Sequence, residues 1–241
     1  MPVLQEATVV KPEPLPNFVS SPYIEALTEQ ALHYIQAGFP VHFRGATGTG
    51  KTTMAMHVAD KLGKPVVLIH GNDEATTSDL VGGEHGYSMS KIIDHYIRSV
   101  LKTSVDVQRR WVDHRLTLAC RHGLTLIYDE YTRARPETNN VLLSVLQEKI
   151  LDLPTRRKGE EPYLTIHPNF VALFTSNPQE YAGVHPTQDA LRDRLVTIDL
   201  DSFDREDEVR ITEAKGGVGR ALAEKIVDGV RALRESGQVE I

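Results

Sequence analysis

The chain has 241 residues, and 27 Lys and Arg against 33 Asp and Glu give it a formal net charge of −6. Hydrophobic residues make up 40% of it and charged residues 25%, which excludes a disordered or collagen-like chain. The length allows one large domain, or one domain with a small appendage. The acidic balance disfavours a surface that neutralises phosphate backbones, so we expect no nucleic-acid partner.

Two further features bear on the compartment. Cys120 is the single cysteine, so the chain can form no internal disulfide, which favours a reducing environment. The stretch Met1–Pro16 has no apolar core of signal-peptide length, and no run approaches the roughly 18 apolar residues that a membrane helix needs. We therefore expect a cytoplasmic protein that does not insert into a membrane.

Prolines crowd the start of the chain, which predicts an extended N-terminal arm over residues 1–20. From Ser21 onward, apolar residues recur at helical spacing and predict a first helix. Apolar runs then predict strands at Val41–Phe43 and Val66–Ile69, with a helix over about Lys51–Leu62 between them. A unit of this kind places its two strands parallel.

The middle of the chain is expected to be helical from about Ser90 to His122, and we interpret Trp111 as part of a buried helix face rather than as a ligand-stacking residue. Further strands are expected at Leu124–Tyr128, Phe170–Thr175 and Val196–Leu200. The alternation of strands and helices predicts an α/β fold with a doubly wound parallel sheet in a domain of residues 21–203. Residues 204–241 are predicted to form one or two helices.

Between these strands, a helix beginning at Pro136 is expected to carry Leu142, Val145 and Leu146 inward. A loop or hairpin tip follows at residues 155–159, Thr-Arg-Arg-Lys-Gly. Its basic run is either a solvated loop or a grip on a partner, and the sequence leaves both open.

A glycine-rich segment after the first predicted strand matches the P-loop pattern of Gly, four residues, Gly-Lys-Ser/Thr. Glycines let successive backbone N–H groups curl around phosphates, and the helix that begins here points its positive end at the same charge. The expected nucleotide-binding residues are Gly45, Ala46, Thr47, Gly48, Thr49, Gly50, Lys51, Thr52 and Thr53. Lys51 is expected to reach the β and γ phosphates, and the Thr52 hydroxyl to take one Mg²⁺ position. The alternative is a glycine-rich connection that binds no ligand. In the predicted strand before the loop, His42 and Arg44 are unusually polar for a central parallel strand.

Two carboxylates, Asp129 and Glu130, follow a strongly apolar predicted strand. They lie at the carboxyl edge of the sheet, where α/β folds bind ligands. Beside a P-loop, the first acid is expected to hold Mg²⁺ and the second to polarise the water that attacks the γ phosphate. The alternative is that Asp129 only caps the next turn. Asn177 ends another strand and is a candidate to orient that water, with a plain Asn-Pro turn as the alternative.

This order of motifs, followed by Leu191-Arg192-Asp193-Arg194-Leu195, resembles an AAA+ ATPase. The segments from Asp129 to Leu143 and from Thr77 to Gly82 are similar to the MoxR branch. Three segments are similar, more specifically, to the gas vesicle protein N family: Pro40 to Gly45, Trp111 to Thr117 and Asn140 to Leu153.

The resemblance implies a P-loop NTPase fold of three layers, αβα, with a five-stranded parallel core and a short helical part of a lid. It implies ATP with Mg²⁺, assembly into a ring, most often a hexamer, and cytoplasmic action on gas vesicle shell or accessory proteins. Lys51 and Thr52 would then be Walker A residues, Asp129 (the metal ligand) and Glu130 the Walker B pair, and Asn177 sensor 1.

Arg194 matches the arginine finger that offsets charge on the γ phosphate in a neighbour's site. Arg192 is the competing candidate, and a surface ion pair with Asp189 or Asp193 is the alternative for either. AAA+ enzymes also carry a second sensor arginine in the lid. Residues 204–241 show no such motif, since Arg231 and Arg234 lack its context.

The chain just before the first strand usually covers the adenine in this architecture, which makes Val19, Tyr23 and Ile24 candidates, with core packing as the alternative. Three functions stay open at this point. The first is an ATP-hydrolysing motor that remodels vesicle proteins during gas vesicle assembly. The second is a nucleotide-dependent scaffold with little turnover, and the third is a general MoxR-type chaperone for another complex.

Overall fold

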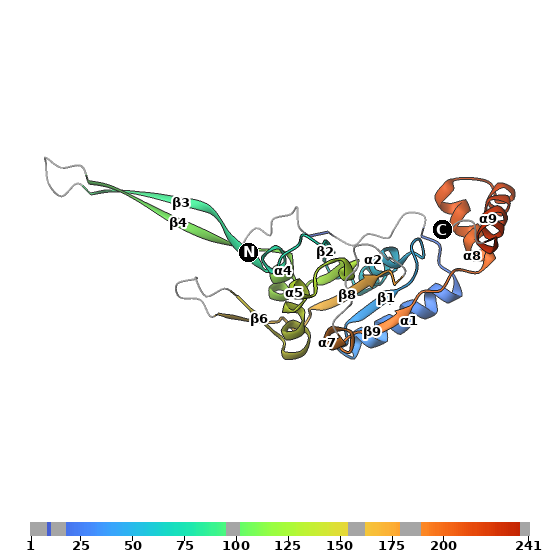
Figure 1. The fold of residues 1–241 in the computed structure, drawn as a ribbon, viewed down its shortest axis with the longest axis horizontal. Helices are drawn as coiled ribbons and strands as arrows, with labels where there is room; N and C mark the ends of the chain where they lie inside the picture. Colours follow the sequence, from blue (N-terminus) through green and yellow to red (C-terminus); the bar gives the residue numbers. More distant parts are fainter. Residues whose placement is uncertain (1–8, 11–17, 95–101, 154–161, 179–188, 237–241) are drawn as a thin grey trace.

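The computed structural model describes residues 9–10, 18–94, 102–153, 162–178 and 189–236. Most of the predicted N-terminal arm and the basic run at residues 155–159 lie outside them. Figure 1 shows a central body of sheet and helices, a long two-stranded ribbon that leaves it, and a pair of helices at the other end.

Five strands form one parallel sheet in the order β2-β5-β8-β1-β9. They are β1 (Val41–Arg44), β2 (Val66–His70), β5 (Thr125–Asp129), β8 (Val171–Ser176) and β9 (Val196–Asp199). The five predicted strands are thus confirmed, each end within one residue. Because all five run parallel, their carboxyl ends meet at one edge of the sheet.

Helices cover both faces of this sheet, which confirms the three-layer αβα fold. Successive residues of a strand point to opposite faces, and β5 shows the result. Leu126 packs in a cluster with residues of α4 (Arg115–His122), whereas Ile127 packs in a second cluster with residues of α1 (Pro22–Gln36) and α2 (Lys51–Leu62). The sheet is therefore buried on both sides, as its apolar strand sequences require.

Local sequence signals account for where the main helices begin and end. The Ser21 hydroxyl caps α1 by accepting from the Ile24 backbone N–H at 3.4 Å, and Pro22 occupies the first turn, where its missing N–H costs nothing. Helix α2 begins after Gly50 and ends at Gly63, both in the left-handed region, with φ of 81° and 64°. The P-loop therefore leads directly into a helix N-terminus.

Short elements fill the connections. They are α3 (Thr77–Val81), the 3-10 turn η1 (Tyr131–Arg133), α5 (Pro136–Asn139), α6 (Val141–Leu143), the π-helical turn η2 (Ser144–Glu148), β6 (Ile150–Asp152), β7 (Tyr163–Thr165) and α7 (Asp189–Arg192). Leu142, Val145 and Leu146 are buried, as predicted. Strands β6 and β7 pair antiparallel on either side of the predicted hairpin tip, which itself is outside the described residues.

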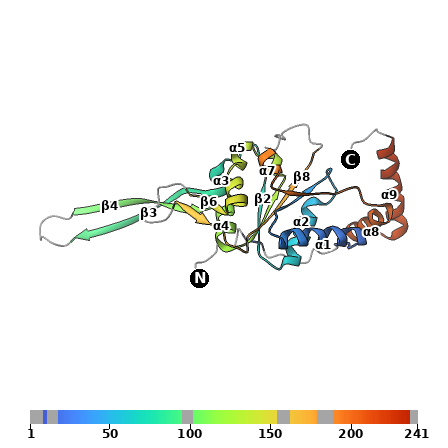
Figure 2. The same cartoon turned by 90° about the horizontal axis from the view of Figure 1, so that it is seen from below.

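The predicted long helix from Ser90 to His122 is wrong for most of its length. Instead, β3 (Gly82–Asp94) and β4 (Lys102–Asp113) form an antiparallel hairpin that extends away from the body (Figures 1 and 2), and only α4 is helical. The alternating β-branched residues Thr103, Val105 and Val107 favour a strand, and pairing with β3 supplies the backbone hydrogen bonds. Trp111 packs against the core as expected, but from β4 rather than from a helix.

Two helices, α8 (Arg205–Gly216) and α9 (Arg220–Glu235), form the predicted helical C-terminal part. They pack on each other through Val209, Ala223 and Val227. Arg231 and Arg234 both donate to the Glu208 carboxylate, at 2.7 and 2.6 Å. These two arginines therefore hold α8 to α9. Among the described helices, none is long and apolar enough to cross a lipid bilayer.

Candidate active site

The loop between β1 and α2 forms a tight backbone cradle. Gly48 and Gly50 have φ of 83° and 81°, a conformation that L side chains rarely adopt. A Cβ on Gly45 would lie 2.7 Å from the Leu200 carbonyl oxygen, so that position also requires glycine. Lys51 lies folded over this loop, and its Nζ donates to the Ala46 carbonyl at 2.7 Å. The cation is thus held at the loop whose backbone N–H groups would bind phosphate.

Asp129 faces the start of α2 from the end of β5. Its Oδ1 accepts from the hydroxyls of Thr52 and Thr175, each at 2.6 Å. The His70 imidazole, at the end of neighbouring β2, lies 3.4 Å from the other carboxylate oxygen. The structure therefore brings together the two residues expected to hold Mg²⁺, and it surrounds the carboxylate with side-chain partners.

Glu130 turns the chain out of the sheet directly after Asp129. Its φ of 51° lies in the left-handed region, which is uncommon for a non-glycine residue, and its backbone N–H donates to the Thr175 hydroxyl at 2.9 Å. A Cβ on Gly71 would lie 1.9 Å from the Glu130 carbonyl oxygen, so this close crossing requires glycine. The Glu130 carboxylate pairs with Arg133 at 2.9 Å, and both side chains are partly exposed.

Asn177 reaches the P-loop from the end of β8. Its side chain is buried, and the amide Nδ2 donates to the Thr47 hydroxyl at 2.7 Å. The amide thus faces the P-loop across the edge of the sheet. Asn177 also precedes a proline, Pro178, as the alternative of an Asn-Pro turn requires. Asp129, Glu130 and Asn177 converge on the P-loop from two adjacent strands, β5 and β8.

The two polar residues of β1, His42 and Arg44, both have hydrogen-bond partners for their side chains. His42 is buried between β8 and β9, and its ring nitrogens lie 2.8 Å from the Ser176 hydroxyl and 3.1 Å from the Thr197 hydroxyl. Burial, with the nearby positive charge of Arg44, lowers the pKa of His42 to about 4. Arg44 pairs with Asp199 through two hydrogen bonds at 2.5 and 2.8 Å.

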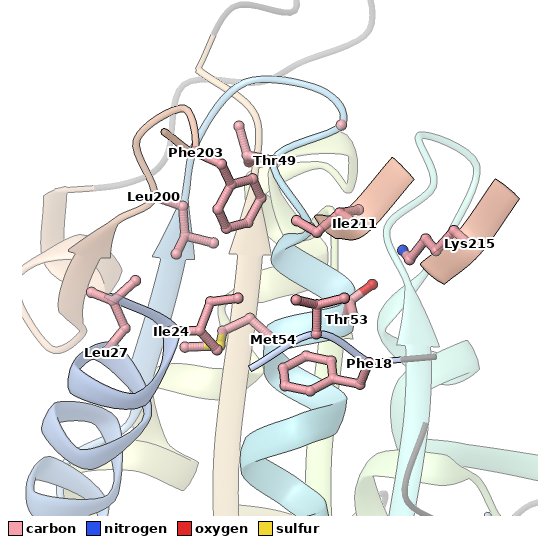
Figure 3. A pocket seen from close by; sticks show the side chains of 13 residues that line it. Phe18, Ile24, Leu27, Thr49, Thr53, Met54, Leu200, Phe203, Ile211 and Lys215 are labelled. Carbon is pink, nitrogen blue, oxygen red and sulfur yellow. The ribbon is translucent and has the colours of Figure 1, made fainter. Parts of the chain in front are cut away.

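A pocket opens beside the P-loop (Figure 3) and has a volume of about 200 Å³. Its lining is mostly apolar: Phe18, Val19, Ile24, Leu27, Gly48, Thr49, Gly50, Thr53, Met54, Leu200, Phe203, Ile211 and Lys215. Two of the three adenine candidates, Val19 and Ile24, line it. Tyr23 does not, since its hydroxyl accepts from the Asp201 backbone N–H at 3.2 Å and its ring packs edge-on against Phe203.

Several lining residues come from segments that no local sequence pattern connects to the P-loop. Phe203 follows β9, and Ile211 and Lys215 lie on α8, with the Lys215 nitrogen directed toward the pocket (Figure 3). The helical C-terminal part therefore contributes a cation to the pocket beside the P-loop, although it carries no recognisable second sensor motif.

Arg194 lies away from these groups. It precedes β9, whereas the P-loop follows the parallel strand β1, so the two stand at opposite edges of the sheet. Its guanidinium donates to the Gln147 side chain and to the Ala190 carbonyl, so its neighbours are neutral rather than the acids Asp189 and Asp193. Arg192 lies on α7, at the same edge. Both arginines thus lie at the opposite edge of the sheet from the P-loop of their own chain.

Known proteins resemble this chain over most of its length. Residues 40–195 match the family model of the AAA domain (dynein-related subfamily). The gas vesicle ATPase GvpN of Ancylobacter aquaticus is 51% identical over 233 residues, which is 97% of this chain and 65% of that protein. GvpN of Haloferax mediterranei is 45% identical over 231 residues, 95% of this chain and 66% of that protein. The chain thus spans slightly less than two thirds of the length of these relatives.

More distant matches extend the pattern. Protein CbbQ of Hydrogenophilus thermoluteolus is 29% identical over 212 residues, 87% of this chain and 72% of that protein. A crystal structure assigned as an ATPase of Cytophaga hutchinsonii superposes with a TM-score of 0.55 at 20% identity, covering 86% of this chain and 58% of that one, which supports the fold. The sequence resemblance is therefore confirmed, and the chain belongs to the AAA domain family, dynein-related subfamily.

Proposed function

We propose that the protein binds ATP with Mg²⁺, hydrolyses it, and uses the hydrolysis to remodel vesicle proteins during gas vesicle assembly. One observation carries the catalytic part of the proposal: the Thr52 hydroxyl and the Asp129 carboxylate meet at 2.6 Å beside a phosphate-binding loop. The names of the relatives that are 45% and 51% identical support the gas vesicle part.

The donor set fits the metal and the nucleotide. Hydroxyl and carboxylate oxygens are the hard ligands that Mg²⁺ prefers, and Thr52 with Asp129 supplies one of each. Thr52 and Asp129 would hold the Mg²⁺, which would offset the negative charge of the phosphates. The glycine cradle, the N-terminus of α2 and Lys51 would hold the phosphates, while the pocket lined by Phe18, Ile24 and Phe203 would take the base.

Glu130 is the residue that would polarise the attacking water, and Asn177 would orient that water and contact the γ phosphate. The positions of Asp129 and Glu130 depend on Thr175, whose hydroxyl contacts both of them. Because the Glu130 carboxylate is paired with Arg133, this ion pair restrains the group that would accept a proton from water.

Arg194 would act on the site of a neighbouring subunit, since it lies at the sheet edge opposite its own P-loop. Arg192, at the same edge, is the second candidate for this role. A shared site of this kind requires an oligomer, and we propose a ring, a hexamer in the form most often adopted by AAA+ proteins. The proposed setting is the cytoplasm, in association with gas vesicles.

A nucleotide-dependent scaffold is the second candidate function. The 2.9 Å ion pair between Glu130 and Arg133 favours it, because a carboxylate oxygen that pairs with a guanidinium is less available to a water. A general chaperone for another complex is the third, and CbbQ, which is 29% identical, is a relative whose name does not mention gas vesicles. All three share the same nucleotide site.

Vesicle formation in cells separates the motor from the scaffold. Gas vesicles scatter light until pressure collapses them, so the turbidity that a culture loses under pressure measures their amount. In cells that produce gas vesicles with this protein, we expect both Lys51→Ala and Glu130→Gln to abolish this turbidity. Nucleotide binding to the purified variants is the control: Lys51→Ala weakens it, by about 10- to 100-fold for a lost charged hydrogen bond, and Glu130→Gln leaves it intact. Normal vesicle formation with Glu130→Gln would establish the scaffold instead.

A further inference from the structure

His42 is a buried polar residue that the proposed hydrolysis does not use. It lies in β1, between β8 and β9, and only 4% of it is exposed. Central parallel strands normally carry apolar residues at such positions, because a buried imidazole costs free energy unless its nitrogens are hydrogen-bonded. A histidine here therefore depends on specific partners.

Both ring nitrogens have those partners, and they come from two different strands. Nε2 lies 2.8 Å from the Ser176 hydroxyl on β8, and Nδ1 lies 3.1 Å from the Thr197 hydroxyl on β9. A neutral imidazole has one donor and one acceptor, and a hydroxyl can serve as either, so both bonds can form at once. The ring also packs edge-on against Tyr131, with centroids 5.2 Å apart. The imidazole is thus fixed on three sides.

Ser176 connects this ring to the nucleotide site. It is the last residue of β8, and the next residue, Asn177, donates its amide to Thr47 of the P-loop at 2.7 Å. The residue before it, Thr175, holds Asp129. Successive side chains of a strand point to opposite faces, so the end of β8 is held by Thr175 on one side and by His42 through Ser176 on the other.

We propose that His42 is a positioning residue for Asn177: by anchoring Ser176, it sets the direction of the Asn177 amide toward the γ phosphate. This inference rests on the proposed role of Asn177 in ATP hydrolysis. Of the two hydrogen bonds of His42, the inference assigns the influence on ATP hydrolysis to the bond with Ser176 and not to the bond with Thr197.

The two bonds can be separated by amide substitutions. In His42→Gln the side-chain amide lies near the former Nε2, and in His42→Asn near the former Nδ1. We expect His42→Leu and His42→Asn to lower kcat about tenfold or more, because misplacement of a group by about 1 Å can cost up to about 100-fold, whereas His42→Gln retains most of it. The Kd for ADP, which has no γ phosphate, stays within about twofold of the wild type in all three.

If substitutions at His42 prevent folding, two matched variants that each remove one of its hydroxyl partners provide the same test. Ser176→Ala is expected to reproduce the effect of His42→Leu, with no further loss in the double variant. Thr197→Val, which removes the hydroxyl on the other side, is expected to keep wild-type kcat. Equal loss in Ser176→Ala and Thr197→Val, or equal loss in His42→Gln and His42→Asn, would overturn the inference.

An equilibrium readout keeps this test independent of turnover. We expect the preference for a non-hydrolysable ATP analogue over ADP to fall in His42→Leu and Ser176→Ala but to persist in His42→Gln and Thr197→Val. If the wild type shows no turnover, the proposed hydrolysis is contradicted. The ratio of the affinities for the ATP analogue and for ADP still tests whether His42 positions Asn177. Affinities for the analogue and ADP that change in equal proportion, or a wild type without any preference, would show that His42 is only part of the core.

Discussion

The Thr52 hydroxyl donates a 2.6 Å hydrogen bond to Oδ1 of Asp129, joining the first turn of α2 to the end of β5. These residues are 77 apart in the sequence, and the parallel sheet alone brings them together. The same carboxylate oxygen accepts from Thr175 at 2.6 Å. The site thus depends on three segments, the P-loop helix and the ends of two adjacent strands.

Thr175 is expected to be important for both stability and chemistry. Thr175→Val keeps the shape but removes the hydroxyl that donates to Asp129 and accepts from the Glu130 N–H. We expect the free energy of unfolding, measured in urea, to fall by about 1–3 kcal/mol, because the partly buried Glu130 N–H and the buried Asp129 carboxylate each lose a hydrogen-bond partner.

Thr125 offers the matched control for this change. It lies on the neighbouring strand β5, and its buried hydroxyl has no hydrogen-bond partner among the described residues. Thr125→Val is therefore expected to leave stability unchanged or to raise it. The same loss in both variants would show that Thr175 contributes through general packing rather than through its two bonds.

Arg133 is expected to restrain Glu130. Since both side chains of this 2.9 Å pair are partly exposed, its strength should be about 0.2–1 kcal/mol. Arg133→Ala is then expected to raise kcat at saturating ATP by roughly 1.5- to 5-fold, because the carboxylate is freed to act as a base. Arg135→Ala, which breaks the nearby pair with Asp73, is the control and should leave kcat unchanged. A fall in kcat with Arg133→Ala would mean that Arg133 orients Glu130 productively.

Lys215 is expected to contact bound nucleotide. Its nitrogen points toward the pocket from α8 (Figure 3), close to the P-loop residues that line the same space. Lys215→Ala should weaken ADP binding by a few-fold to about tenfold, measured by calorimetry, as expected for a partly exposed charged hydrogen bond. Lys225→Ala removes an exposed lysine on α9, outside the pocket, and should have no effect. Equal weakening by both substitutions would point to a general charge effect.

His42 also makes stability depend on pH. Its pKa falls from 6.5 to about 4 on folding, chiefly through burial, so between these values the unfolded chain binds a proton that the folded chain does not. Stability therefore rises with pH in this window, and it is expected to drop by about 3 kcal/mol from pH 6.5 to pH 4 on account of this group. Urea unfolding across the window should show a smaller drop for His42→Gln. Identical slopes in both proteins would contradict a neutral buried His42.

The sequence indicated the sheet and the polar residues at its carboxyl edge well, for a physical reason. Strands such as β5 and β8 are buried on both faces and read as short apolar runs, and the residues that follow them must lie at one edge. The hairpin β3–β4 was missed because its stability depends on pairing between segments, while local spacing also suited a helix. Phe203, Ile211 and Lys215 were missed because only tertiary packing brings them to the pocket.

Arg194 is proposed to complete the site of a neighbouring subunit, and mixing two inactive variants tests this role directly. Glu130→Gln keeps the arginine but lacks the base, whereas Arg194→Ala keeps the base but lacks the arginine. We expect each variant alone to lose steady-state ATP hydrolysis, by about 100-fold or more, and an equal mixture to regain a substantial part of it. Wild-type turnover per subunit should also rise with protein concentration. A mixture that stays inactive beside an active wild type, or full activity in Arg194→Ala alone, would contradict the account.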